Sequence, residues 1–326
     1  MSREDRESLL RLDHRVLINV VVTDSSGNPV NGLKEEDFTL LDQDRPQAIN
    51  SFQMVDGKSA TGRAHIVLLI DSVNNSFSDV ARQRRTVDAY LRQNGGRLSF
   101  PVSLALLSDK GLQKIDSSLD GNLLAAQLHQ RFSRPGRFSF NGGPSGGNQR
   151  FLLSIAALRT IAAEEREVTG RVILVWMGQG WPSLTDPGYE AATPEDKKSY
   201  FDALVQLSTT LRIAQVTIDN VSSADPSRPG DGTEQHNLLG IRRPEEAEAR
   251  DLSLSTMVQL TGGRILNQER DLVVGIGQCA LEANTYYRMS FDPETAKRPN
   301  ELRHLEVKMD RPALLPRTYT LYYAQP

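Results

Sequence analysis

Hydrophobic and polar residues alternate along the first part of the chain with the two-residue period of a β-strand. Val16, Ile18, Val20 and Val22 fall on one side of this run and predict a strand with one buried face. The same period returns later and predicts further strands at 37–41, 47–55, 286–291, 304–309 and 318–323. β patterns therefore lie at both ends of the chain.

Between residues 63 and 284 short apolar runs alternate with helical periodicity. Strands are expected at 65–70, 101–108, 111–118, 171–177, 213–218 and 264–266. One helix is expected to begin near Ser78 and another near Asn148, each of which is a possible N-cap. Further helices are expected at 122–129, 196–211, 252–260 and 269–283. This alternation favours a mostly parallel sheet with helices on both faces, and the strand at 111–118 is expected to return antiparallel at an edge.

Neither terminal β segment has enough strands to bury a core alone, so we expect the two ends to pair. The predicted fold is α/β, a Rossmann-like, doubly wound, mostly parallel sheet inserted between the halves of a β-sandwich. Its expected parts are the N-terminal half of the sandwich at 1–62, the α/β domain at 63–284 and the C-terminal half at 285–326.

Composition narrows the function classes. The net charge of −3, from 38 basic and 41 acidic residues, gives no reason to expect nucleic-acid binding, which needs a basic surface. No apolar run approaches the roughly 18 residues of a membrane span. The charged start at 1–7 lacks the apolar core of a signal peptide, which indicates a cytoplasmic protein or a trimmed start.

Asp71 is the most informative residue of the chain. It follows the apolar run 65–70 and precedes the polar stretch 72–76, after which a helix is expected. A buried parallel strand that ends in an acidic residue presents its carboxylate at the carboxyl edge of an open α/β sheet. Ligands of such sheets bind at that edge, so the pattern predicts a site there.

Six segments, taken in their order and spacing, carry a resemblance that covers nearly the whole chain. They are INVVVTD at 18–24, GNPVNGL at 27–33, EDF at 36–38, LIDSVN at 69–74, WMGQGWP at 176–182 and YYRM at 286–289. The chain resembles the acidobacterial VWFA-related proteins, and its α/β part resembles a von Willebrand factor A domain. The resemblance implies binding and adhesion, no enzymatic activity, and export to the periplasm or the cell exterior.

The resemblance also implies a metal-ion-dependent adhesion site, made of an Asp-x-Ser-x-Ser loop, a Thr and a strand-terminal Asp. Here Asp71 is present, but Val73 stands at the third position and Asn75 at the fifth. The Thr position falls near Asn148, and the strand that should end in Asp ends at 177–178. One carboxylate and two amides make a poor Mg²⁺ site.

Three interpretations of Asp71 stay open. The first is a Mg²⁺ site built from Asp71, Asn75 and Asn148, with Asn74 or Ser76 replacing a ligand by a register shift. The second is a carboxylate that bonds to the loop backbone and caps the next helix. The third is a metal-free polar ligand site.

Other chemistry has weaker support. The glycine-rich segment 142–147 lacks the Gly-Lys-Ser/Thr of a phosphate-binding loop. Ser72 lies where a loop nucleophile can lie, without a Gly-x-Ser-x-Gly elbow, so a hydrolase using Ser72 and His236 is only a second alternative. Cys279 is the single cysteine, which excludes an intramolecular disulfide, and it is expected to be buried.

Two long loops, 179–194 and 221–249, leave strand ends on the side of Asp71. Their aromatic residues suit a protein interface, although Trp181 can equally fold back over its own strand. We therefore expect a non-enzymatic protein-binding or adhesion module without a cofactor. The alternative is a Mg²⁺-dependent ligand binder, and the oligomeric state stays open. The expected ligand-binding face comprises Asp71, Asn74, Asn75, Asn148, Phe140 and Trp181.

Overall fold

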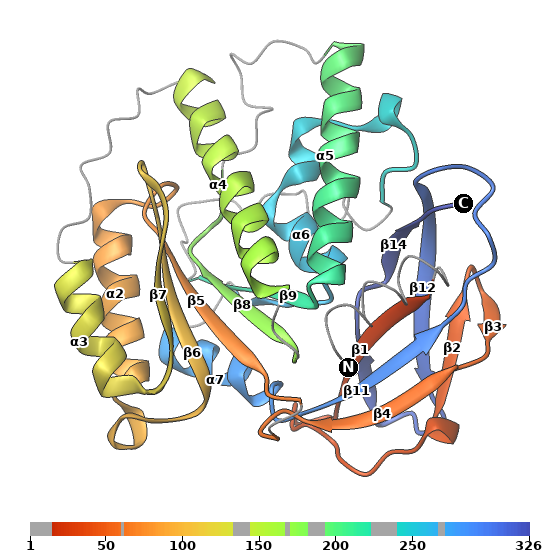
Figure 1. The fold of residues 1–326 in the computed structure, drawn as a ribbon, viewed down its shortest axis with the longest axis horizontal. Coiled ribbons are helices and arrows are strands. Elements are labelled where there is room, and N and C mark those ends of the chain that lie inside the picture. Colours follow the sequence, from red (N-terminus) through yellow and green to blue (C-terminus); the bar gives the residue numbers. More distant parts are fainter. Residues whose placement is uncertain are drawn as a thin grey trace.

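The computed structural model describes most of the chain, in seven segments. These are residues 15–59, 62–132, 144–166, 170–181, 193–222, 240–266 and 271–326. Figure 1 shows an α/β unit with a central sheet beside two smaller sheets that contain both ends of the described chain.

The central sheet has six strands in the order β10-β9-β8-β5-β6-β7. All neighbouring strands are parallel except β6 and β7, which are antiparallel, as expected for the edge strand. The parallel strands are apolar and largely buried, because helices cover both of their faces. The strands are β5 (His65–Asp71), β6 (Arg97–Ser108), β7 (Gly111–Asp120), β8 (Val172–Met177), β9 (Val216–Val221) and β10 (Ile265–Leu266).

Within the described residues, six α-helices flank this sheet. One hydrophobic cluster joins its first face to α4, α5 and α6, and a second joins the other face to α2, α3 and α7. No helix of the described residues is long and apolar enough to cross a membrane. The helices are α2 (Phe77–Leu91), α3 (Gly121–Arg131), α4 (Pro144–Glu165), α5 (Pro194–Ile213), α6 (Leu254–Leu260) and α7 (Leu272–Leu281). Short 3-10 turns lie at Glu35–Asp37, Gln93–Gly96, Pro244–Glu246 and Ala249–Leu252.

The chain ends meet in two antiparallel four-stranded sheets, ordered β13-β1-β11-β4 and β14-β12-β2-β3. β1 pairs with β11 and β2 pairs with β12, so strands from opposite ends of the sequence lie side by side. The strands are β1 (Val16–Thr23), β2 (Phe38–Asp42), β3 (Arg45–Gln47), β4 (Ser51–Asp56), β11 (Thr285–Phe291), β12 (Glu301–Met309), β13 (Leu315–Arg317) and β14 (Leu321–Ala324).

One hydrophobic cluster includes residues of both small sheets, among them Ile18, Leu40, Phe291 and Leu305. The α/β unit packs against these sheets, since Phe201 of α5 makes an edge-to-face contact with Tyr323 of β14. The mixed α/β class with a parallel sheet region is confirmed. The domain boundaries at 62 and 284 stay a prediction.

Candidate functional site

Asp71 ends β5 at the carboxyl edge of the central sheet and is fully buried. Its Oδ1 accepts hydrogen bonds from the backbone N–H groups of Val73 and Asn74, each at 3.0 Å. Its Oδ2 accepts from the Asn74 side-chain amide at 2.8 Å and from the Trp176 indole at 3.1 Å. Burial raises the pKa of Asp71, while these N–H donors favour its charged form.

These four hydrogen bonds bear directly on metal binding. An ionised carboxylate offers about four lone-pair sites, and four N–H donors already point at Asp71. Val73 is buried in the core and offers no side-chain ligand. Within the described residues no group of three or more His, Cys, Asp or Glu is arranged to hold a metal. The residues at Asp71 therefore do not fit Mg²⁺, which needs oxygen ligands with free lone pairs.

The loop after β5 is braced by its neighbours. The Asn75 side-chain amide donates to the backbone oxygen of Asp71 at 2.9 Å, and Gln83 of α2 accepts from the Asp71 N–H at 3.2 Å. Gly178 has a φ of +112°, and a Cβ built on it would lie 2.4 Å from the Asn75 side chain. The close approach of the two loops thus requires glycine at 178. Asp71 caps no helix, because Ser76 is the N-cap of α2.

Asn148 lies elsewhere than predicted. The helix α4 begins at Pro144, so Asn148 is an exposed residue inside it and not its N-cap. Proline is favoured in the first turn of a helix, and that signal indicates the earlier start. Among the described residues Asn148 makes no hydrogen bond to the Asp71 loop. The contact between α4 and this loop is made by Ser154 instead, whose hydroxyl accepts from the Asn74 amide at 3.0 Å.

Trp181 is not a surface residue either. It is 7% exposed, its indole N–H donates to the Leu252 backbone oxygen at 2.7 Å, and its ring packs edge-on against Trp176 with 5.3 Å between centroids. A buried indole needs a partner for its N–H, and the 3-10 turn at Ala249–Leu252 supplies one. The fold-back interpretation of Trp181 is confirmed. Neither Trp181 nor Asp71 can therefore contact a partner directly in this conformation.

Among the described residues, one exposed part of this edge is the start of α2. Phe77 is the first residue of that helix and is 68% exposed. A small hollow at the same edge is lined by Asn75, by Asp79 and Arg82 of α2, and by residues at the ends of β8 and β9. Phe77 is absent from the predicted ligand-binding face, although a lone aromatic within a polar stretch after a buried strand is the available signal.

The remaining candidates change the picture little. Ser72 is 1% exposed and its hydroxyl donates to the Leu107 backbone oxygen at 2.7 Å, so it is not free to attack a substrate. Cys279 is buried as expected, and burial raises the pKa of its thiol. Phe140 and His236 lie outside the described residues.

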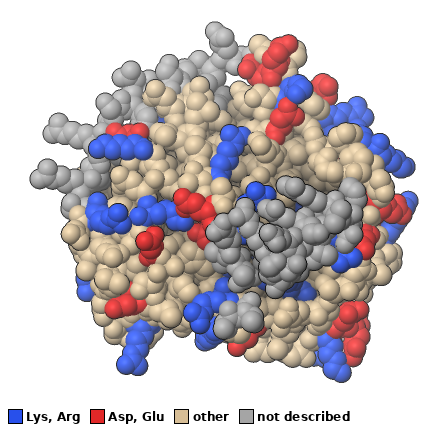
Figure 2. All heavy atoms as spheres, viewed as in Figure 1, with Lys and Arg blue, Asp and Glu red and all other residues tan. Residues whose placement is uncertain are grey.

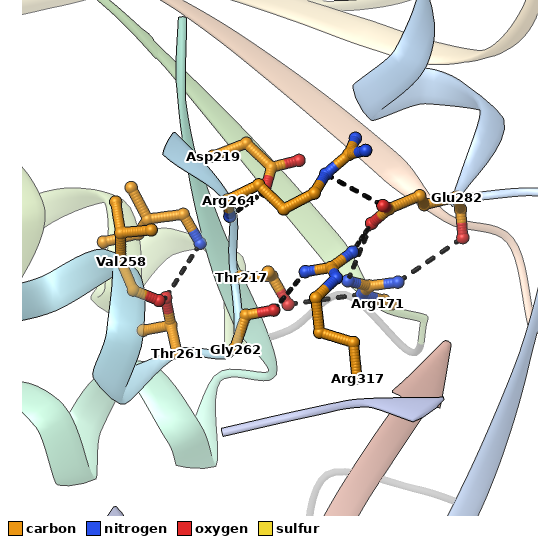
Figure 3. Close-up of polar contacts among 10 residues, drawn as sticks. Arg171, Thr217, Asp219, Val258, Thr261, Gly262, Arg264, Glu282 and Arg317 are labelled. Carbon is orange, nitrogen blue, oxygen red and sulfur yellow. Dashed lines mark hydrogen bonds and ion pairs between the residues drawn. The ribbon is translucent and has the colours of Figure 1, made fainter. Parts of the chain in front are cut away.

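A second polar cluster, which was not predicted, lies at the amino edge of the sheet, opposite the carboxyl edge that contains Asp71. Figure 3 shows the side chains of Arg171, Arg264 and Arg317 converging on Glu282, which follows α7. Arg264 Nε lies 2.9 Å from Glu282, Arg171 Nη2 lies 3.9 Å away, and Arg317 of β13 forms an ion pair with the same carboxylate. Burial lowers the pKa of Arg317 to about 10. Glu282 therefore ties the small sheets to the α/β unit.

Comparisons with known proteins give little further information. No family model matches the chain, and no curated protein matches it. Among solved structures, a crystal structure of the human COPII-coat protein Sec24c aligns with a TM-score of 0.37 and 10% sequence identity. That alignment covers 82% of this chain and 44% of the Sec24c chain, so the chain spans less than half of that protein.

Proposed function

We propose that this chain is a non-enzymatic protein-binding module. In this proposal the α/β unit is a von Willebrand A-like domain inserted into a β-sandwich, and its carboxyl-edge loops engage a protein partner without a metal ion. The resemblance in sequence supports this fold and favours an exported protein. The observation that carries the metal-free part is the Trp176 indole, which donates to Asp71 at 3.1 Å.

The contact surface in this proposal is Phe77 at the start of α2, together with the hollow lined by Asn75, Asp79 and Arg82. Aromatic side chains that combine large apolar area with few rotatable bonds are frequent anchors in interfaces. Phe77 is 68% exposed, and the ion-paired side chains of Asp79 and Arg82 on the same helix add charged groups that can form a polar rim. On the face seen in Figure 2 basic and acidic side chains are interspersed, so that face presents mixed charge.

The test compares three forms of the full chain as bait in a pull-down followed by purification of the retained protein. Phe77→Ala should weaken binding of that protein by at least tenfold, because truncation of an interface anchor costs about 1.4 kcal/mol or more. Leu315→Ala is the matched control, since Leu315 is 56% exposed but lies in β13. Equal binding by wild type and Phe77→Ala would contradict the proposed surface.

Two other functions remain as alternatives from the sequence. A Mg²⁺-dependent binder requires that Asn74 and Trp176 release Asp71, and partner binding would then be lost with a chelator. A hydrolase requires Ser72 to exchange its bond to Leu107 for a substrate, and a broad ester, peptide and phosphate substrate screen tests it. We favour the metal-free binder, because each alternative must first break hydrogen bonds that are present.

A further inference from the structure

A second pocket lies in the small sheets, away from the loops around Asp71. Its volume is about 190 Å³, more than ten times the roughly 15 Å³ that a single water needs. The β2–β3 hairpin and β12 contribute most of its charged lining, and the segment before β12 contributes the remainder. A cavity of this size has room for one small organic molecule.

Buried acidic groups dominate the floor of the pocket. The side chains of Asp42 and Arg303 are 4% and 5% exposed, and Glu301 is 20% exposed. Arg303 donates to Asp42 Oδ2 at 3.2 Å and to Glu301 Oε1 at 3.1 Å. Two carboxylates thus share one guanidinium, which leaves one negative charge in excess.

Among the described residues, one oxygen of the buried Asp42 carboxylate lacks a well-formed hydrogen bond. Its buried Oδ1 makes no well-formed hydrogen bond within the described residues, and the buried Tyr322 hydroxyl, which lies near enough to favour the charged carboxylate, has no well-formed partner either. Burial raises the pKa of Asp42 despite the neighbouring Arg303. A bound donor that completes the hydrogen bonds of Asp42 would relieve the cost of a buried acceptor without a full partner.

Exposed basic groups dominate the rim. Arg45 and Glu294 are each 70% exposed and form an ion pair at 3.2 Å. Lys297 is also exposed, and its ammonium makes no ion pair with any described residue, while its backbone N–H donates to Glu301 at 3.0 Å. The rim therefore has one positive charge in excess, opposite in sign to the floor.

We propose that this pocket binds a small zwitterion, with an ammonium or guanidinium group directed at Asp42 and Glu301 and a carboxylate directed at Lys297 and Arg45. The opposed charges of floor and rim match the two ends of such a molecule. A simple cation satisfies only the floor, and a simple anion satisfies only the rim. The pocket is separate from Phe77, so the proposal does not depend on the function proposed above.

Isothermal titration of the full chain with 4-guanidinobutyrate tests this. Butylguanidine lacks the carboxylate and should bind about tenfold more weakly, and butyrate should give no heat. Lys297→Gln changes an exposed residue and leaves the floor intact. It should lower the affinity for 4-guanidinobutyrate to the level of butylguanidine. Lys34→Gln is its control, because Lys34 is also exposed and lies outside the pocket.

The floor is tested by Asp42→Asn, with Asp44→Asn in the same hairpin turn as the control. Asp42→Asn should abolish binding of 4-guanidinobutyrate, and Asp44→Asn should leave its Kd unchanged. Because Asp42→Asn also removes a buried ion-pair partner, the Lys297→Gln comparison keeps the proposal testable if the floor variant unfolds. Absence of heat with 4-guanidinobutyrate, or equal affinity for butylguanidine in the wild type, would overturn the proposal.

Discussion

The carboxyl and amino edges of the central sheet each bury a carboxylate, and the two edges stabilise it in different ways. At the carboxyl edge Asp71 is surrounded by four N–H donors that carry no formal charge. At the other side Glu282 is surrounded by three arginines. Fixed dipoles satisfy the first carboxylate without a cation, whereas the second needs cations from distant parts of the chain. The Asp71 carboxylate therefore finds all these donors within the α/β unit, and the Glu282 cluster joins that unit to the small sheets.

Glu282→Gln should have the largest effect on this contrast. It leaves three mostly buried arginines without their shared carboxylate, and breaking a buried ion pair typically costs about 3–5 kcal/mol. Urea denaturation measures the change in unfolding free energy. Glu36→Gln is the control, because Glu36 is 76% exposed in its pair with Lys34 and should change stability by less than about 1 kcal/mol. A loss at Glu282 as small as that at Glu36 would show that the cluster is not a structural tie.

Trp176→Phe should have an intermediate effect and sharpens the account of Asp71. It removes one donor from a buried carboxylate and should cost about 1.5–3 kcal/mol, the range for hydrogen bonds to charged groups. Trp181→Phe removes a similar buried indole whose N–H bonds only to a neutral backbone oxygen. It should therefore cost less by roughly 1 kcal/mol in the same denaturation assay. The opposite ranking would mean that the Trp176 bond contributes little.

The smallest expected effect concerns pH and a third buried carboxylate, Glu165. Burial alone would raise the pKa of Glu165, but His65 at 2.7 Å and Lys114 at 3.0 Å more than offset it, so the pKa lies below its ordinary value. A depressed carboxyl pKa stabilises the fold above the unfolded value of about 4.3, and this stability is lost as pH falls through the folded pKa.

Unfolding measured from neutral pH down through that window should show a smaller acid-induced loss for Glu165→Gln than for wild type. Glu164→Gln is a fair comparison, because Glu164 also contacts Lys114 but is 49% exposed. Identical acid profiles for wild type and Glu165→Gln would refute this assignment.

Elements that depend on neighbouring residues in the sequence were predictable from its hydrophobic pattern. The run at 65–70 predicted that Asp71 ends a buried strand, and the segment at 111–118 was expected to return antiparallel at the sheet edge, as β7 does. The partner Trp176 was not predictable, because it is 105 residues away and sits in a strand whose register only the folded sheet fixes. The Glu282 cluster was missed for the same reason, since its arginines come from three separate segments.

Two local errors had local causes. The α2 helix is capped by Ser76, which accepts from the Asp79 N–H, although Ser78 also has a capping side chain and was preferred. The α4 helix begins at Pro144, although Asn148, four residues later, also has a capping side chain. In both cases the local sequence offered two acceptable helix starts a few residues apart.

The most direct test of the central claim is thermal unfolding of the wild-type chain and of Asp71→Asn, each with excess Mg²⁺ or Mn²⁺ and with chelator. If N–H donors alone satisfy Asp71, the Tm of the wild type is the same with metal and with chelator. A bound ion whose free concentration is 100 times its Kd would stabilise the fold by about 2.7 kcal/mol and raise the Tm by several degrees. Such a rise in the wild type, absent in Asp71→Asn, would contradict the account.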